Sequence, residues 1–216
     1  FQQISDFEDS KTFQKKLRSV WQLQQHVSYC LFGSKKHLMN ELFEKKNLPF
    51  YKFGDAIYLT KIETKYWIEY ICKRFENTGK HISPELAEEI CRLVDNHSSY
   101  VQQLSWLLWI RTINTATTEQ LTYALEDLLD QNNILFQSET ENLSAYQMNF
   151  LKAIVDGIHT KFSSKEVISK YNLGTSANIV RLKNALLQKE LIETNGKEIV
   201  LADPVFGVWF KKEMLY

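Results

Sequence analysis

The last third of the chain carries the pattern that most limits the possible folds: helical segments followed by a hairpin signal. Helical periodicity begins at Ser144 and again at Ser176, and a short helix is expected between them at 165–171. Asn195 and Gly196 then separate two β-type runs. This dipeptide favours a tight hairpin, because both residues tolerate positive φ. Helix, short helix, turn, helix and hairpin is the order of a winged helix-turn-helix.

The middle of the chain shows helical periodicity from one segment to the next. Each segment opens on serine or threonine, whose side chains cap helices. Pro84 stands at the expected first turn of the second segment, and Gly79 lies just past the end of the first. Helices are expected to begin at Thr64, Ser83, Ser98 or Ser99, and Thr117 or Thr118. Together they predict a four-helix group.

Two short apolar runs near the amino terminus, 27–32 and 56–59, are expected to be buried strands, with a helix at 35–46 between them. Uninterrupted apolar runs of this length usually belong to parallel sheets that are covered on both faces. Ligands of such sheets lie beyond the carboxyl ends of the strands. Gly33 and Ser34 directly follow the first run and are therefore a candidate binding position. An ordinary strand-to-helix turn is the alternative.

Charge is unevenly distributed along a chain whose formal net charge is zero. Residues 1–84 hold 14 Lys and Arg against 9 Asp and Glu, residues 85–143 hold 2 against 10, and residues 144–216 hold 10 against 7. An acidic middle between two basic ends favours docking between segments of the chain. The distribution argues against a generic nucleic-acid binder.

The sequence contains no motif of self-contained catalysis or metal binding. It has neither a G-x-x-x-x-G-K-[ST] phosphate loop nor a G-x-S-x-G elbow. The five histidines and three cysteines lack metal-ligand spacing, so no metal site is expected. Isolated thiols suit a reducing cytosol, and no run approaches the ~20 apolar residues of a membrane span. We therefore expect a cytoplasmic protein without a membrane partner.

Four segments carry a family resemblance. Residues 32–62, FGSKKHLMNELFEKKNLPFYKFGDAIYLTKI, resemble the second half of the ATPase domain in prokaryotic P-loop ATPases of the archaeal-ATPase type, within the STAND and AAA+ group. Residues 1–4 resemble the segment after the acidic Walker B pair of that family. Residues 97–102 resemble its Gly-His-Pro-Phe-Tyr-Val-Gln motif, and 203–210 its Asp-Pro-x-Phe-x-x-Trp ending. The resemblance covers nearly the whole chain.

The resemblance implies an ATP site of which only part lies in this sequence. Its nucleotide contacts would be Gly33, Ser34, His97 and Tyr100, with Ser34 in a sensor position near the γ-phosphate. It also implies that the chain begins just past the Walker B pair. ATP and Mg would then bind only together with the P-loop half, and the chain alone would not hydrolyse ATP. Helix-start packing is the alternative role for His97 and Tyr100.

The sequence departs from the family pattern at four positions. Asn96 stands where the motif has glycine, and Ser98 and Ser99 replace its proline and phenylalanine. Phe53 occupies the place of an arginine in the Pro-Leu-Tyr-Gly-Arg motif. These replacements bear on whether a complete ATP site would hydrolyse nucleotide.

Residues and resemblance together predict a fold that is mainly α with a small α/β remnant. Its parts are the carboxyl-terminal part of a P-loop ATPase core at 1–62, a helical lid at 63–138, and a winged helix-turn-helix at 139–216. The P-loop half of the parent chain is the implied partner of this assembly.

The winged helix leaves two functions open. In a DNA-binding winged helix, the segment from Ser176 would enter the major groove and the hairpin tip would touch the backbone. The residues that would face DNA or a protein partner are Asn178, Arg181, Lys183, Asn184 and Lys197. One hypothesis is a regulatory P-loop ATPase whose winged helix responds to nucleotide. The other is a stand-alone module that binds DNA or protein.

Overall fold

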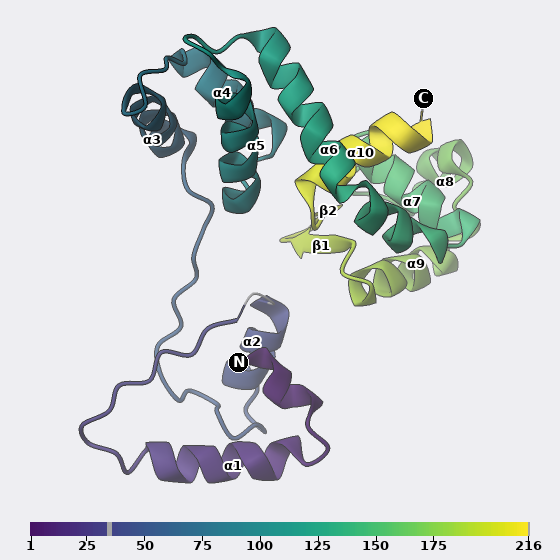
Figure 1. The fold of residues 1–216 in the computed structure, drawn as a ribbon. Helices are drawn as coiled ribbons and strands as arrows, with labels where there is room; N and C mark the ends of the chain where they lie inside the picture. The colour runs from purple at the N-terminus through teal and green to yellow at the C-terminus, as the bar shows by residue number, and fades with distance from the viewer. Residues whose placement is uncertain (34–35, 216) are drawn as a thin grey trace. The chain divides into compact units, whose positions relative to one another are not determined.

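The computed structural model describes residues 1–33 and 36–215. They form two compact units, Phe1–Leu59 and Thr60–Tyr216 (Figure 1). None of the described helices is both long enough and apolar enough to cross a lipid bilayer.

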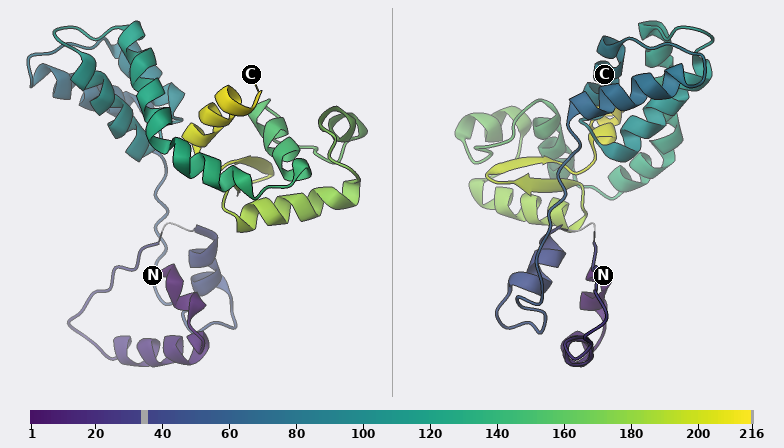
Figure 2. Two further views of the ribbon diagram at one scale, coloured as in Figure 1. Left: turned by 45° about the vertical axis from the view of Figure 1, so that its right-hand side comes forward. Right: turned by 90° about the vertical axis from the view of Figure 1, so that its left-hand side faces the viewer.

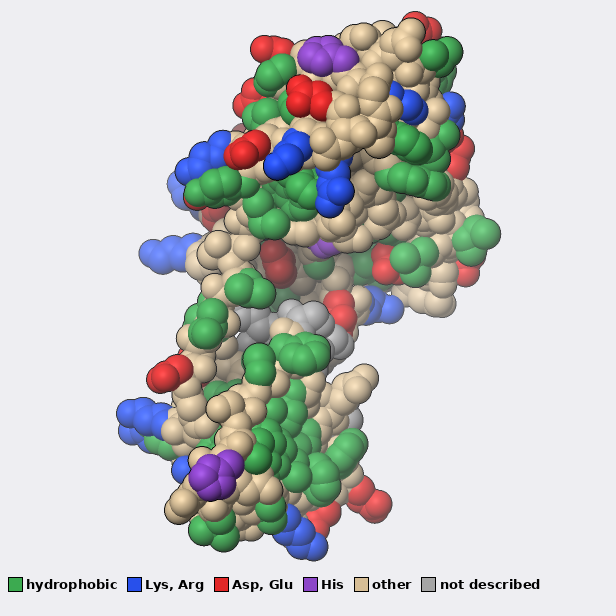
Figure 3. Space-filling view, turned by 60° about the vertical axis from the view of Figure 1, so that its left-hand side comes forward, with side chains coloured by type: hydrophobic (Ala, Val, Ile, Leu, Met, Phe, Trp, Pro, Cys, Tyr) green, Lys and Arg blue, Asp and Glu red, His purple; other side chains and the backbone are tan. Residues whose placement is uncertain are grey.

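The first unit is built from a short 3-10 helix, η1 (Gln2–Asp6), and two α-helices, α1 (Ser10–Trp21) and α2 (Lys36–Glu44). Aromatic rings hold these pieces together: Phe50 lies 5.5 Å from Phe1 and 5.6 Å from Trp21, centroid to centroid. Arg18 donates hydrogen bonds to the carbonyls of Pro49 and Tyr51, and its guanidinium lies 5.4 Å from the ring of Phe53. Figure 3 shows hydrophobic side chains gathered on one face of this unit, in its lower half.

The two strands expected in the first unit are not formed. Segments 27–33 and 55–63 have no regular secondary structure, and Ile57 and Leu59 are 85% and 94% exposed. A parallel strand is stable only when neighbouring strands satisfy its backbone groups and helices cover its faces. Within the described residues, neither segment has such a neighbour. The prediction of strands at 27–32 and 56–59 is therefore wrong within the described residues.

The second unit begins with a helical group. Its helices are α3 (Thr64–Glu76), α4 (Pro84–Leu93), α5 (Ser98–Arg111) and α6 (Thr118–Glu141). Side-chain caps explain two of these starts: Ser83 accepts a hydrogen bond from the backbone N–H of Leu86, and Thr117 forms a capping box with Gln120. Helices α3 and α5 begin at Thr64 and Ser98 after the N-cap residues Glu63 and His97, whose side chains make no capping hydrogen bond. Gly79 has a φ of 72° just past α3, as a terminating glycine requires. These starts agree with the sequence expectation.

Helix α6 extends beyond residue 138, where the predicted helical lid ends. It continues as one helix to Glu141 and enters the last part of the fold (Figures 1 and 2). Its final turns bury Phe136 against the last helix, with ring centroids 5.4 Å from Phe206 and 5.6 Å from Trp209. The helical group and the winged helix therefore share a single element.

The last part contains the predicted winged helix. Its elements are α7 (Ala145–Val155), α8 (Lys165–Tyr171), α9 (Ser176–Gln188), β1 (Ile192–Asn195), β2 (Glu198–Leu201) and α10 (Pro204–Leu215). The two strands pair antiparallel, from Ile192 opposite Leu201 to Asn195 opposite Glu198. The hairpin loop is Gly196-Lys197, one residue later than expected, and Gly196 has a φ of 62°. Glycine at the first loop position suits a type II′ turn.

One hydrophobic core runs through the whole second unit, from Trp67 in α3 to Phe210 in α10. At the junction, the indole N–H of Trp209 donates to the side-chain oxygen of Asn133 at 2.8 Å. A mainly helical fold with a two-stranded wing is thus confirmed.

Candidate functional site

The loop between α4 and α5 has the most constrained backbone near the predicted site residues. Asp95 and Asn96 both have positive φ, 47° and 53°. Consecutive left-handed residues other than glycine are uncommon, and Asn and Asp tolerate that region best. Asn96 therefore fills a position that glycine would also suit, which accounts for one departure from the family motif.

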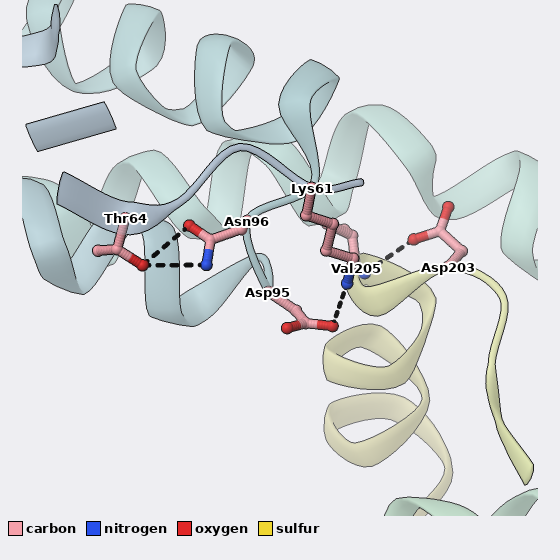
Figure 4. Close-up of polar contacts among 6 residues, drawn as sticks. All are labelled: Lys61, Thr64, Asp95, Asn96, Asp203 and Val205. Atoms are coloured by element: carbon pink, nitrogen blue, oxygen red, sulfur yellow. Dashed lines mark hydrogen bonds and ion pairs between the residues drawn. The ribbon is translucent and has the colours of Figure 1, made fainter. Parts of the chain in front are cut away.

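Contacts with the segment before and at the start of α3 hold this loop in place (Figure 4). The ammonium of Lys61 pairs with the carboxylate of Asp95 at 2.5 Å. The amide nitrogen of Asn96 donates to the hydroxyl of Thr64 at 3.0 Å, and that hydroxyl lies 3.2 Å from the amide oxygen. These side-chain bonds, to residues some thirty positions earlier, add to the backbone hydrogen bond from Asn96 to the carbonyl of Cys91 in holding the left-handed conformation.

His97 follows the loop and is the N-cap residue of α5, but its side chain makes no capping hydrogen bond. Its ring lies 4.8 Å from that of Tyr100, and its Nδ1 is buried without a hydrogen-bond partner among the described residues. Ser98 is the first residue of α5, a position at which proline is favoured because the N–H there has no helical partner. Proline of the motif would therefore suit this position, and nothing in the structure explains its replacement by serine.

Tyr100 connects this helix start to the winged helix. Its hydroxyl donates to one carboxylate oxygen of Asp203 at 2.5 Å. The other oxygen of Asp203 accepts from the backbone N–H groups of Val205 and Phe206, at 2.7 and 3.1 Å, and so caps α10. A hydrogen bond to a charged group is stronger than a neutral one. One carboxylate thus binds α5 and α10 together.

Burial and the neighbouring carboxylate set the protonation states around Tyr100. Burial raises the pKa of Tyr100, and its hydrogen bond to Asp203 raises it further. Burial also raises the pKa of Glu139, at the end of α6, and the charge of Asp203 adds to this effect. Tyr100 is therefore a neutral hydrogen-bond donor at physiological pH.

A hollow of about 450 Å³ lies beside the loop. It is lined mainly by acidic and polar side chains: Thr64, Glu85, Glu88, Glu89, Cys91, Arg92, Asp95 and Asn96. Burial raises the pKa of the Cys91 thiol to about 11, which makes it unreactive at neutral pH. Among the described residues, no group of His, Cys, Asp and Glu is placed to hold a metal ion.

The other predicted nucleotide contacts lie in the first unit. Gly33 is exposed at the end of an irregular segment, and Ser34 lies outside the described residues. The structure brings His97 and Tyr100 together, but Tyr100 uses its hydroxyl on Asp203. The role of these residues toward a nucleotide stays a prediction.

The predicted partner surface lies on α9 and the wing. Arg181, Asn184 and Lys197 are exposed, and Lys183 is half-buried. The amide nitrogen of Asn178 donates to the carbonyl of Leu173 at 3.0 Å, so this side chain supports the turn before α9.

Sequence reasoning missed Asp203 and Glu139 as partners of Tyr100. More than a hundred residues separate Tyr100 from Asp203. No local pattern links positions so distant, although both belong to segments that carry the family resemblance.

Comparisons with known proteins support this architecture. The family model of a probable winged helix domain matches residues 134–212. No curated protein matches the chain. Among solved structures, the Walker-type ATPase of Pyrococcus abyssi is similar, with a TM-score of 0.68 and 17% sequence identity. The match covers 94% of this chain but 58% of that one. At this identity the likeness shows only a shared fold. The winged helix at the carboxyl end of this chain is supported by the family model.

Proposed function

We propose that the chain is the carboxyl-terminal part of a cytosolic, prokaryotic ATP-binding protein of the AAA+ and STAND type, in which nucleotide state acts on the winged helix. The observation that carries this proposal is the start of α5. There His97 and the uncapped first turn lie next to Tyr100, which is hydrogen-bonded to Asp203 at the start of α10. The fold shared with a Walker-type ATPase over 94% of this chain supports it.

The residues at this helix start fit one part of a nucleotide site. N–H groups of an uncapped first turn suit a phosphate, and the unpartnered Nδ1 of His97 is a further polar group beside them. Tyr100 fits a positioning role better than a direct nucleotide contact, because its hydroxyl already donates a hydrogen bond to Asp203. ATP, once bound with Mg, supplies a transferable phosphoryl group. The phosphate loop and the magnesium ligands would come from the P-loop half of the parent protein.

The reading frame upstream of the codon for Phe1 tests the proposal first. We expect it to encode a P-loop lysine and, just before Phe1, an Asp-Glu pair. A start codon directly before Phe1 would contradict the proposal.

Nucleotide binding by the protein with its upstream region gives a second test. His97→Ala should weaken Mg-ATP binding in a calorimetric titration, whereas the exposed His81→Ala should not. Ser34→Ala should slow hydrolysis more than it weakens binding, because a hydroxyl near the γ-phosphate acts where charge redistributes. The 216-residue chain alone should not bind Mg-ATP at micromolar concentration. Binding by that chain, or an unaffected His97→Ala protein, would count against this site.

A second candidate function is binding of DNA or a protein partner through α9. The exposure of Arg181 and Asn184 favours it, because arginine and asparagine side chains read base edges. The surplus of basic residues is small, so duplex DNA should bind weakly, with little sequence preference and steep salt dependence. A gel shift compares Arg181→Ala with the exposed Lys152→Ala as control. Tight, sequence-selective binding that is lost only in Arg181→Ala would favour this second function.

A further inference from the structure

The α4–α5 loop is held from two sides by contacts that differ in kind. On one side, Lys61 and Thr64 bind the side chains of Asp95 and Asn96. On the other side, Tyr100 lies one turn into α5 and binds Asp203. Both sets of bonds converge on a stretch of six residues, 95–100.

The loop conformation depends on the first set of bonds together with the backbone hydrogen bond from Asn96 to Cys91. Left-handed residues other than glycine are strained, and they persist where neighbouring contacts hold them. If the bonds from Lys61 and Thr64 are lost, the loop can relax toward more favourable backbone angles. Relaxation would displace the start of α5, since His97 directly follows Asn96.

The docking of α10 depends on the second set. Asp203 must face Tyr100 with one oxygen while its other oxygen caps α10. A shift of the α5 start would lengthen the Tyr100 hydrogen bond and leave its half-buried hydroxyl and one carboxylate oxygen of Asp203 unpaired. Loss of a hydrogen bond to a charged group destabilises a structure more than loss of a bond between neutral groups.

We infer that residues 95–100 act as a coupling element: the position of the segment that enters α3 sets how firmly α10 is docked. This segment is the covalent connection from residues 1–59. Whatever orders or displaces it, a nucleotide or a partner, would therefore act on the winged helix through Asn96 and Tyr100. The inference does not depend on nucleotide binding.

Amide hydrogen exchange of the 216-residue chain, read by mass spectrometry, tests this coupling. Tyr100→Phe keeps the ring and removes the hydroxyl, and it should speed exchange in α10 about tenfold, since 1.4 kcal/mol corresponds to a factor of ten. Thr64→Val, far from α10 in sequence, should speed the same amides about threefold. In the double variant the two effects should combine to less than their product, because both act through one loop.

Matched variants separate coupling from general loss of stability. Thr122→Val and Tyr123→Phe alter exposed hydroxyls on α6 that bond within their own helix, and they should leave α10 exchange unchanged. Asn96→Ala removes the amide and, unlike glycine, does not favour the left-handed backbone, so it should speed the same amides at least as much as Thr64→Val. Amides of α9 provide the internal reference for global opening.

The inference would be overturned if Thr64→Val and Asn96→Ala speed exchange only in α3 and α4. It would also be overturned if the effects of Thr64→Val and Tyr100→Phe multiply in full. If a variant speeds α9 and α10 equally, its effect is global and the coupling is absent.

Discussion

Residues 1–59 and 60–216 bury apolar side chains to very different extents. Among the described residues of the first unit, the fully buried apolar side chains are Ile4, Leu42 and Phe50. The second unit has one continuous core that passes through all of its helices and both strands. Aromatic content alone does not explain the contrast, since Phe1, Trp21, Phe43 and Phe53 also pack around the small core.

The difference shows what an apolar segment requires in order to become structure. In the second unit, each apolar helix face meets another face formed by the same chain. In the first unit, the apolar segments 27–33 and 55–63 meet no strand among the described residues and stay exposed. The comparison predicts that stability resides in residues 60–216.

Cutting the chain should show the largest effect. A chain of residues 60–216 should fold with a cooperative thermal transition, because its core is complete. A chain of residues 140–216 should aggregate, since it lacks Phe136 and Asn133 and exposes the ring of Trp209. Light scattering and circular dichroism measure both. If the chain of residues 140–216 is soluble and folds cooperatively, the winged helix is stable without α6, and the prediction is wrong.

Two tryptophan truncations give the next largest contrast. Trp209→Ala should lower the free energy of unfolding of the main transition by about 3–5 kcal/mol, because it removes a buried ring and leaves Asn133 unpaired. Trp21→Ala, in the first unit, should change that transition by less than about 1 kcal/mol. Urea titrations followed by circular dichroism measure both. Equal losses would mean that the two units unfold as one.

A pair of arginine substitutions sharpens the comparison at the level of polar contacts. Arg18→Gln should lower the stability of the first unit by about 1–2 kcal/mol, since Arg18 binds two backbone carbonyls and lies against Phe53. Arg111→Gln removes an ion pair with Asp127 and should cost below about 1 kcal/mol in the second unit. Hydrogen exchange in α1 and α5 reports each effect. A larger loss of stability from Arg111→Gln than from Arg18→Gln would contradict this prediction.

The smallest expected effect concerns Glu139. Its raised pKa means that the folded state binds this proton more tightly than the unfolded chain. The resulting stabilisation is present below the unfolded pKa and is lost as pH rises through the folded value. Glu139→Gln should therefore stabilise the second unit at pH 7, by roughly a few tenths of a kcal/mol because solvent screens the charge. Glu141→Gln, exposed on the same helix, should have no such effect. Unfolding at pH 4 and pH 7 measures both.

Helices of the second unit were predictable because their signals are local. Ser144 and Ser164 cap helices that start where their side chains indicated, and Gly196 opens the hairpin within one residue of its expected place. Helix α10 was not anticipated as a helix, since its apolar residues show no single face.

The errors concern relations between distant residues. Segments 27–32 and 56–59 have the composition of strands, yet a strand also needs a partner, and composition says nothing about partners. The hydrogen bond between Tyr100 and Asp203 could not be predicted either, because composition does not show which distant residues meet in the fold. Of the candidate site, the sequence indicated His97 and Tyr100 but not the carboxylate that positions one of them.

The shared helix α6 has a consequence for how such domains are exchanged between genes. The family model for the winged helix begins at residue 134, inside α6, and not at the loop that follows. Asn133 and Phe136, in the last turns of α6, hold Trp209. A recombination joint placed in the loop after Glu141 would separate α10 from these last turns of α6. The apolar side chains of α10 would then be exposed. Chimeras of this architecture should be joined within α6 upstream of Asn133, with the rotational phase of the helix preserved, so that the transferred winged helix keeps the residues that pack against Trp209.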